Sequence, residues 1–63
     1  MKNGDRVYIS GEVYYGDTWY SVSSYGTIKD IEEHMSLVSI DMIDGDSNAW
    51  VYVENKYIVK EVI

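Results

Sequence analysis

Apolar and polar residues alternate most regularly in the second half of the segment 26–42. The positions that fall on one face of an extended chain there are Val38, Ile40 and Met42. Ser39 and Asp41 fall between them, and therefore on the opposite face. Because the side chains of a β-strand alternate between its two faces, this pattern predicts a strand with an apolar face in the core and a polar face in solvent.

The first half of the segment 26–42 is less regular. Ile28 and Ile31 are an odd number of residues apart, so a regular strand would place them on opposite faces. A β-bulge near Asp30 would bring both side chains to the core. A helix over 30–37 is the competing interpretation, because the apolar residues there also fit a spacing of about 3.6. The β-branched residues on both sides favour two antiparallel strands joined by a short acidic turn.

The stretch 11–25 is predicted to be a long, irregular loop that follows the first strand. Within it, two short strand-like arms, about 12–15 and 18–22, are expected to pair loosely across Gly16-Asp17, because this dipeptide is a hairpin-type signal. Long loops on a rigid scaffold often carry function, so we expect the binding surface to lie on this stretch.

The remaining segments complete an all-β chain of five strands. The elements expected are turns at 3–5 and 43–48, strands at 6–10, 49–53 and 58–63, and a single helical turn at 54–57. The side chains predicted to form the core are Val7, Ile9, Ile28, Val38, Ile40, Val51, Val53 and Ile58.

Length and composition limit how this fold is stabilised. We expect one domain, 1–63, and a domain of this size buries only roughly 60% of the surface that its unfolded chain exposes. The absence of cysteine excludes disulfides and thiolate metal sites, and a single histidine excludes any site that needs two imidazoles. Seven tyrosines and two tryptophans, with no phenylalanine, indicate that aromatic side chains supply much of the packing.

The formal charge of −6 comes from eleven acidic and five basic residues. Such a balance repels phosphate backbones and favours basic partners, or simply keeps a small protein in solution. The first residues contain no apolar stretch of the kind found in signal peptides, and no run approaches the ~18 apolar residues that span a bilayer. We therefore expect a cytoplasmic protein without membrane contact.

The order of the predicted elements resembles that of an SH3-like barrel. Gly4-Asp5-Arg6-Val7-Tyr8-Ile9, with Gly26-Thr27-Ile28 downstream, looks like the opening of a KOW or Tudor-type SH3-like domain. Glu54-Asn55-Lys56-Tyr57-Ile58 is similar to the turn before the last strand of SH3 domains, which there carries a proline, an asparagine and a ligand-contacting tyrosine. The proline is missing here, and one residue is inserted between Asn55 and Tyr57. The resemblance implies a five-stranded SH3-like barrel, with a long loop after strand 1 and a helical turn before the last strand, but not peptide specificity.

Two sequence features resemble parts of a metal site, but neither supplies a complete set of ligands. The run Asp44-Gly45-Asp46-Ser47-Asn48 matches the first three ligand positions of an EF-hand calcium loop, but Ala49 and Asn55 stand where that loop needs its glycine and its bidentate glutamate. We therefore predict a polar hairpin turn. His34 has only Glu32 and Glu33 beside it, so it is predicted to be a solvated turn residue.

The sequence contains no recognisable catalytic motif. None of its serines lies in a G-x-S-x-G motif, and His34 is the only imidazole base. A domain of this size also has little room for a water-excluding pocket of ~300 Å³. We expect a protein that is not an enzyme and that uses no cofactor.

The aromatic residues are the strongest functional signal. Nine are more than so small a core can hide, and five of them fall between Tyr14 and Tyr25. Contiguous exposed aromatic side chains usually mark a partner site. The residues expected to form it are Tyr14, Trp19, Tyr20 and Tyr57, with Glu12 and Asp17 as an acidic border. Three classes of partner could bind such a surface: a protein, a methylated lysine or single-stranded nucleic acid.

The favoured hypothesis is a non-enzymatic module that binds a protein partner. Small, acidic, cysteine-free domains of this kind resemble proteins of phages and mobile elements that inhibit host factors. In a variant of this hypothesis an acidic patch imitates nucleic-acid phosphates, and its residues are Asp30, Glu32, Glu33, Asp41, Asp44 and Asp46. The alternative is nucleic-acid binding of the KOW type, but the basic residues are few and scattered along the chain.

Overall fold

The computed structural model describes residues 2–60. Its elements are β1 (Arg6–Tyr15), β2 (Thr18–Ile31), β3 (Met35–Ile43), β4 (Asp46–Glu54), the 3-10 turn η1 (Asn55–Tyr57) and β5 (Ile58–Lys60). All strand pairings are antiparallel. Residues 2–60 are therefore all-β, with five strands and a single helical turn before the last of them, as predicted. The predicted end of the last strand, 61–63, lies outside the described residues.

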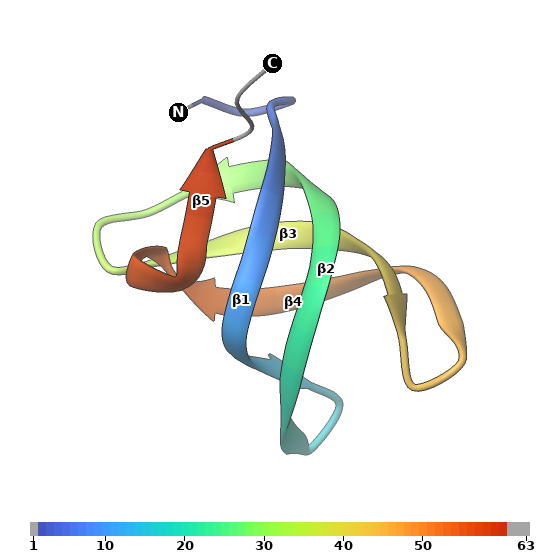
Figure 1. The fold of residues 1–63 in the computed structure, drawn as a ribbon. Helices are drawn as coiled ribbons and strands as arrows, with labels where there is room; N and C mark the ends of the chain where they lie inside the picture. Colours follow the sequence, from blue (N-terminus) through green and yellow to red (C-terminus); the bar gives the residue numbers. More distant parts are fainter. Residues whose placement is uncertain (1, 61–63) are drawn as a thin grey trace.

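The strands pair into an uneven ring. β1 pairs with β2 along its whole length, β2 pairs with β3, and β3 pairs with β4. β1 also pairs with β4, but only through two residue pairs, Val13 with Val53 and Tyr14 with Tyr52. β5 continues the sheet on the N-terminal half of β1. Figure 1 shows the β1–β2 hairpin crossing in front of β3 and β4, and the core side chains of these four strands fill the space between the two layers.

The two antiparallel strands and the bulge predicted for the segment 26–42 are confirmed. β2 and β3 form an antiparallel hairpin, and its register shifts between Ile28 and Asp30, where the β-bulge was expected. Both residues that motivated the bulge face inward, since Ile28 is buried and Ile31 packs against the core. The competing interpretation, a helix over 30–37, is wrong.

The prediction for the stretch 11–25 is confirmed only in part: the arms 12–15 and 18–22 pair across Gly16-Asp17 as expected, but the irregular loop is wrong. β1 and β2 run through this stretch as one regular hairpin in unbroken register, and Gly16-Asp17 is its two-residue turn. Gly11 does not interrupt β1 because its φ of +154° keeps the backbone nearly extended. A Cβ at this position would overlap the ring of Tyr57, so the glycine serves a close approach between β1 and η1.

The buried core agrees closely with the predicted set. Seven of its eight members are buried, namely Val7, Ile9, Ile28, Val38, Ile40, Val51 and Val53. Ile58 is only partly buried because β5 lies at the edge of the sheet and pairs with β1 alone. Val13, Ile43 and Ala49 complete the core. Val13 was missed because β1 was predicted to end before it.

Two predictions about β3 need correction. Met42 was expected beside Ile40 in the core, but 53% of its surface is exposed and Ile43 is buried instead. The buried positions change from even to odd numbers between Ile40 and Ile43, and on the facing strand Asn48 has a φ of +53°, in the left-handed region. Ser39, expected in solvent, is buried because it lies between its paired neighbours Thr27 and Trp50.

A hydrogen-bond network around Asn55 joins η1 to the turn between β2 and β3. The Nδ2 atom of Asn55 donates to the backbone oxygens of Glu32 (2.9 Å) and Glu33 (3.2 Å), and its backbone N–H donates to the oxygen of His34 (2.9 Å). The Oδ1 atom accepts a hydrogen bond of 2.6 Å from the buried hydroxyl of Ser36. Asn55 thus holds η1 and the turn between β2 and β3 together.

Candidate interaction surface

Three aromatic residues lie side by side on the outer face of the sheet. Tyr14 on β1 is directly opposite Trp19 on β2 and directly opposite Tyr52 on β4. Directly opposed residues in antiparallel strands share a face, so the three side chains form one aromatic row across three strands. The rings of Tyr14 and Trp19 meet edge to face with centroids 5.2 Å apart. Their exposed fractions are 38% for Tyr14, 51% for Trp19 and 46% for Tyr52.

Trp50 enlarges this surface beyond the aromatic row. It lies two residues before Tyr52 on β4, on the same face, and 59% of its surface is exposed. The ammonium group of Lys29 is 5.8 Å from the centroid of its ring, within the range of a cation–π contact. Tyr52 and Trp50 were not among the predicted site residues, although their alternation with Val51 and Val53 already indicated that they face outward.

Acidic side chains border the aromatic row. Glu12 and Glu54 are each two residues from a member of the row, Tyr14 and Tyr52 respectively, and share its face of the sheet. Asp17 lies in the turn next to the Trp19 end and is exposed. The predicted border of Glu12 and Asp17 therefore does flank Tyr14 and Trp19.

The other two predicted anchors lie on the inner side. Tyr20 packs against the core, and its hydroxyl donates a hydrogen bond of 3.2 Å to Oδ2 of Asp44. Tyr57 also packs against the core, with its ring over Gly11. The expectation that Tyr57 forms the edge of the aromatic surface is therefore wrong, because β1 separates it from Tyr14.

A pair of tyrosines ties the tip of the β1–β2 hairpin to the turn between β3 and β4. The hydroxyl of Tyr15 donates a hydrogen bond of 2.6 Å to Oδ2 of Asp46, beside the contact between Tyr20 and Asp44. The hydrogen bond to Asp46 raises the pKa of Tyr15 above its usual value, and the burial of the ring adds to this. For Tyr20 the burial of the side chain is the main cause of the raised pKa, followed by the negative charge of Asp44.

These raised pKa values predict how stability depends on alkaline pH. The stabilisation from the two hydroxyls is complete below the ordinary tyrosine pKa of 10.0 and is lost as the pH rises through the raised values. Urea unfolding across this range should show a falling free energy of unfolding, with a shallower fall in the double variant Tyr15→Phe/Tyr20→Phe. Tyr8→Phe is the control, because the Tyr8 hydroxyl contacts the Ser23 hydroxyl rather than a carboxylate. An equal slope in the double variant and the parent would contradict the role of the two contacts.

The six residues of the predicted acidic patch are not brought together. Asp30, Glu32 and Glu33 lie where β2 turns into β3, whereas Asp44 and Asp46 lie at the opposite end of β3, where both accept tyrosine hydroxyls. In Figure 1 these two connections are on opposite sides of the molecule.

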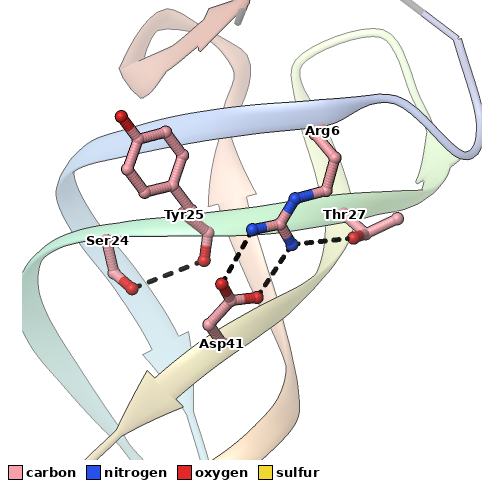
Figure 2. A network of polar contacts seen from close by, with 5 residues as sticks. All are labelled: Arg6, Ser24, Tyr25, Thr27 and Asp41. Carbon is pink, nitrogen blue, oxygen red and sulfur yellow. Dashed lines mark hydrogen bonds and ion pairs between the residues drawn. The ribbon is translucent and has the colours of Figure 1, made fainter.

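Asp41 is already engaged in an ion pair. Figure 2 shows the guanidinium group of Arg6 facing both carboxylate oxygens of Asp41, at 2.9 Å and 2.8 Å, with Thr27 as a further acceptor at 3.2 Å. The hydrogen bonds from Arg6 hold the pKa of Asp41 below its usual value of 3.8, although partial burial opposes this. The contact ties β1 to β3 across the outer face of β2.

The predicted turn chemistry fits the geometry around Asp44 and His34. Asp44 and Asn48 both have positive φ angles, which aspartate and asparagine tolerate better than most residues. His34 lies 3.9 Å from the carboxylate of Glu33, and both side chains are highly exposed. Within residues 2–60, no three histidine or acidic side chains are grouped so that they could hold a metal ion. In the same part of the chain, no helix has the length and apolar character needed to cross a membrane.

Comparison of the chain with models of known protein families, with curated proteins and with solved structures found no match. The case for a function therefore depends on the geometry described above.

Proposed function

We propose that this chain is a non-enzymatic interaction module that binds a protein partner through its aromatic row. The observation that carries the proposal is the placement of Trp19, Tyr14 and Tyr52 on three adjacent strands, each with more than a third of its surface exposed. Tyr14 and Trp19 are held on the fully paired β1–β2 hairpin, so little backbone entropy is lost at these two residues when a partner binds. Aromatic anchors of this kind often contribute most of the binding energy of an interface.

We further propose that the partner presents an apolar side chain flanked by lysine or arginine. The aromatic row supplies the apolar contact, and the exposed carboxylates of Glu12 and Asp17 border it. The net charge of −6 would also accelerate the encounter with a basic partner.

The proposed scaffold is an SH3-like barrel. The five antiparallel strands, the 3-10 turn before β5 and the pairing of β1 with both β2 and β4 support this arrangement. The unevenness of the ring is concentrated in the short contact between β1 and β4.

Nucleic-acid binding is less well supported by the surface. Arg6 pairs with Asp41, Lys29 lies over the ring of Trp50, and Lys56 is 3.8 Å from a carboxylate oxygen of Glu54. These three cations, each beside an acid or a ring, do not form a basic groove. Titration with labelled DNA and RNA at low and high salt tests this directly, because phosphate contacts weaken steeply as salt is raised.

The proposal predicts a specific pattern of binding losses. A partner is first captured from a cell lysate and identified, and its affinity is then measured by calorimetry. Alanine at Tyr14, Trp19 or Tyr52 should weaken binding by about 30-fold or more, which corresponds to ~2 kcal/mol, and should leave the fold intact.

Tyr25→Ala is the matched control for these variants. Tyr25 is a tyrosine of similar exposure (45%) that pairs with Tyr8, away from the aromatic row, and its loss should leave the affinity unchanged. Normal binding by the row variants, combined with loss of binding when the Glu32, Glu33, Asp44 and Asp46 charges are reversed, would favour the phosphate-mimic hypothesis instead.

A further inference from the structure

β2 has one edge that no other strand covers over part of its length. On one side β2 pairs with β1 throughout residues 18–27. On the other side it pairs with β3, but only from Gly26 onward, so in the described part of the chain the stretch 18–25 has a strand on one side alone. β3 diverges from β2 beside Tyr25, near the Arg6–Asp41 ion pair, and Figure 1 shows the lower half of β2 without a strand on its outer side.

The direction of the backbone groups along this edge follows from Ile28. Its N–H donates to the oxygen of Asp5 (2.9 Å), and its oxygen accepts from the N–H of Gly4 (2.8 Å), so both groups point toward the β1 side. Backbone groups alternate in direction along a strand, so even-numbered residues of β2 face β1 and odd-numbered residues face the uncovered edge. The backbone groups that point to this edge are those of Trp19, Ser21, Ser23 and Tyr25. The Tyr25 oxygen already accepts a hydrogen bond of 3.4 Å from the Ser24 hydroxyl, which leaves the first three as the open edge.

The open edge has none of the features that usually keep strand edges apart. Natural proteins place charged side chains, prolines or bulges on such edges. The run Thr18–Ile28 contains no charged residue and no proline, although a quarter of the chain is charged. The bulge in β2 comes only after Ile28, beyond the open edge.

We propose that the open edge pairs with the same edge of a second copy of this chain. In an antiparallel arrangement centred on Ser21, the two Ser21 residues lie opposite each other, and Trp19 of one copy lies opposite Ser23 of the other. On the inner face, Tyr20 lies opposite Val22. The small serine side chains leave room for the tryptophan, and the apolar pairs add cross-strand contacts.

Charge favours a second copy over a basic partner strand at this edge. Within 18–24 there is no carboxylate with which a lysine or arginine on a facing strand could pair. Two copies that each carry a charge of −6 repel one another overall, but this neutral segment places no like charges in direct opposition. The two-fold pairing also occupies the open edge of both chains, so no further copy can add at this edge and assembly stops at a dimer.

The dimer is tested by sedimentation equilibrium of the intact chain over a range of concentrations, at low and high salt. We expect a reversible dimer that becomes tighter with salt, because salt screens the repulsion between the two acidic chains. Hydrogen exchange should show the amides of Trp19, Ser21 and Ser23 protected at high concentration and exchanging rapidly at low concentration.

Ser21→Pro should weaken the dimer by about tenfold or more, because it removes a donor that points to the open edge and is not used within the chain. Ser21→Glu provides a second test if the proline variant does not fold, because it places two like charges opposite each other. Ser10→Glu is the matched control, since Ser10 is also an exposed serine but lies on β1, whose partner there is β2. A chain that stays monomeric at about 1 mM, a dimer that weakens with salt, or a dimer that is unaffected by both Ser21 variants would overturn the proposal.

Discussion

Replacing Gly11 by alanine should destabilise the fold by about 3–5 kcal/mol. The added Cβ would overlap the ring of Tyr57, which packs over this position, and the φ of +154° is a conformation that residues with a side chain rarely adopt. A chain of this length is expected to have a total stability of only about 3–9 kcal/mol. The variant should therefore lose a large share of its free energy of unfolding, as measured by urea titration followed by circular dichroism.

Gly16→Ala is the matched control for this variant. Gly16 also has a positive φ (+63°), but no atom lies within 4 Å of the position that its Cβ would occupy. Its cost should be limited to backbone strain, about 1 kcal/mol. If the two alanine variants were equally stable, the contact between Tyr57 and β1 would not be the reason for a glycine at position 11.

Ile40→Ala should cost about 2–4 kcal/mol, because it leaves a cavity at a fully buried position. Ile40 lies between Gly26 on β2 and Ala49 on β4, and neither of these small residues has a side chain that can fill the space. The surrounding strands are held by their own hydrogen bonds, so the site cannot collapse fully. Urea unfolding of the purified variant gives the change in free energy directly.

Met42→Ala is the informative comparison, because the sequence pattern and the structure disagree about it. The pattern places Met42 beside Ile40 in the core, whereas the structure leaves more than half of it exposed. The change in stability should therefore stay within about 0.5 kcal/mol. A loss as large as that of Ile40→Ala would show that β3 keeps its alternation to the end and that Met42 packs in the core.

Local alternation was sufficient to predict most of this fold. The hairpin of β2 and β3, its bulge and the inward faces of β1 and β4 all follow from a period of two and from turn residues. The errors arose where a contact distant in sequence decides the outcome. Gly11 looks like the end of a strand until Tyr57 is known to lie over it.

The same reason explains which parts of the candidate site could be predicted. Tyr14 and Trp19 could be found, because they lie in one hairpin with an evident turn. Tyr52 joins them only because β4 closes against β1, and nothing in the local sequence specifies that pairing. Tyr20 was assigned to the wrong side, because the predicted irregular loop gave no alternation from which to decide which way it points. Tyr57 lies in the predicted helical turn 54–57, and its expected position came from the resemblance to SH3 domains.

The short contact between β1 and β4 links partner binding at the aromatic row to the opening of the strand ring. Two residue pairs join these strands, so this seam is where the ring can open with the smallest loss of backbone hydrogen bonds. Tyr14 and Tyr52 face each other across it. A partner that binds both rings would therefore hold the seam closed. Amide exchange should then slow at Tyr14 and Tyr52, whose backbone groups point across the seam, far more than along the long β1–β2 hairpin.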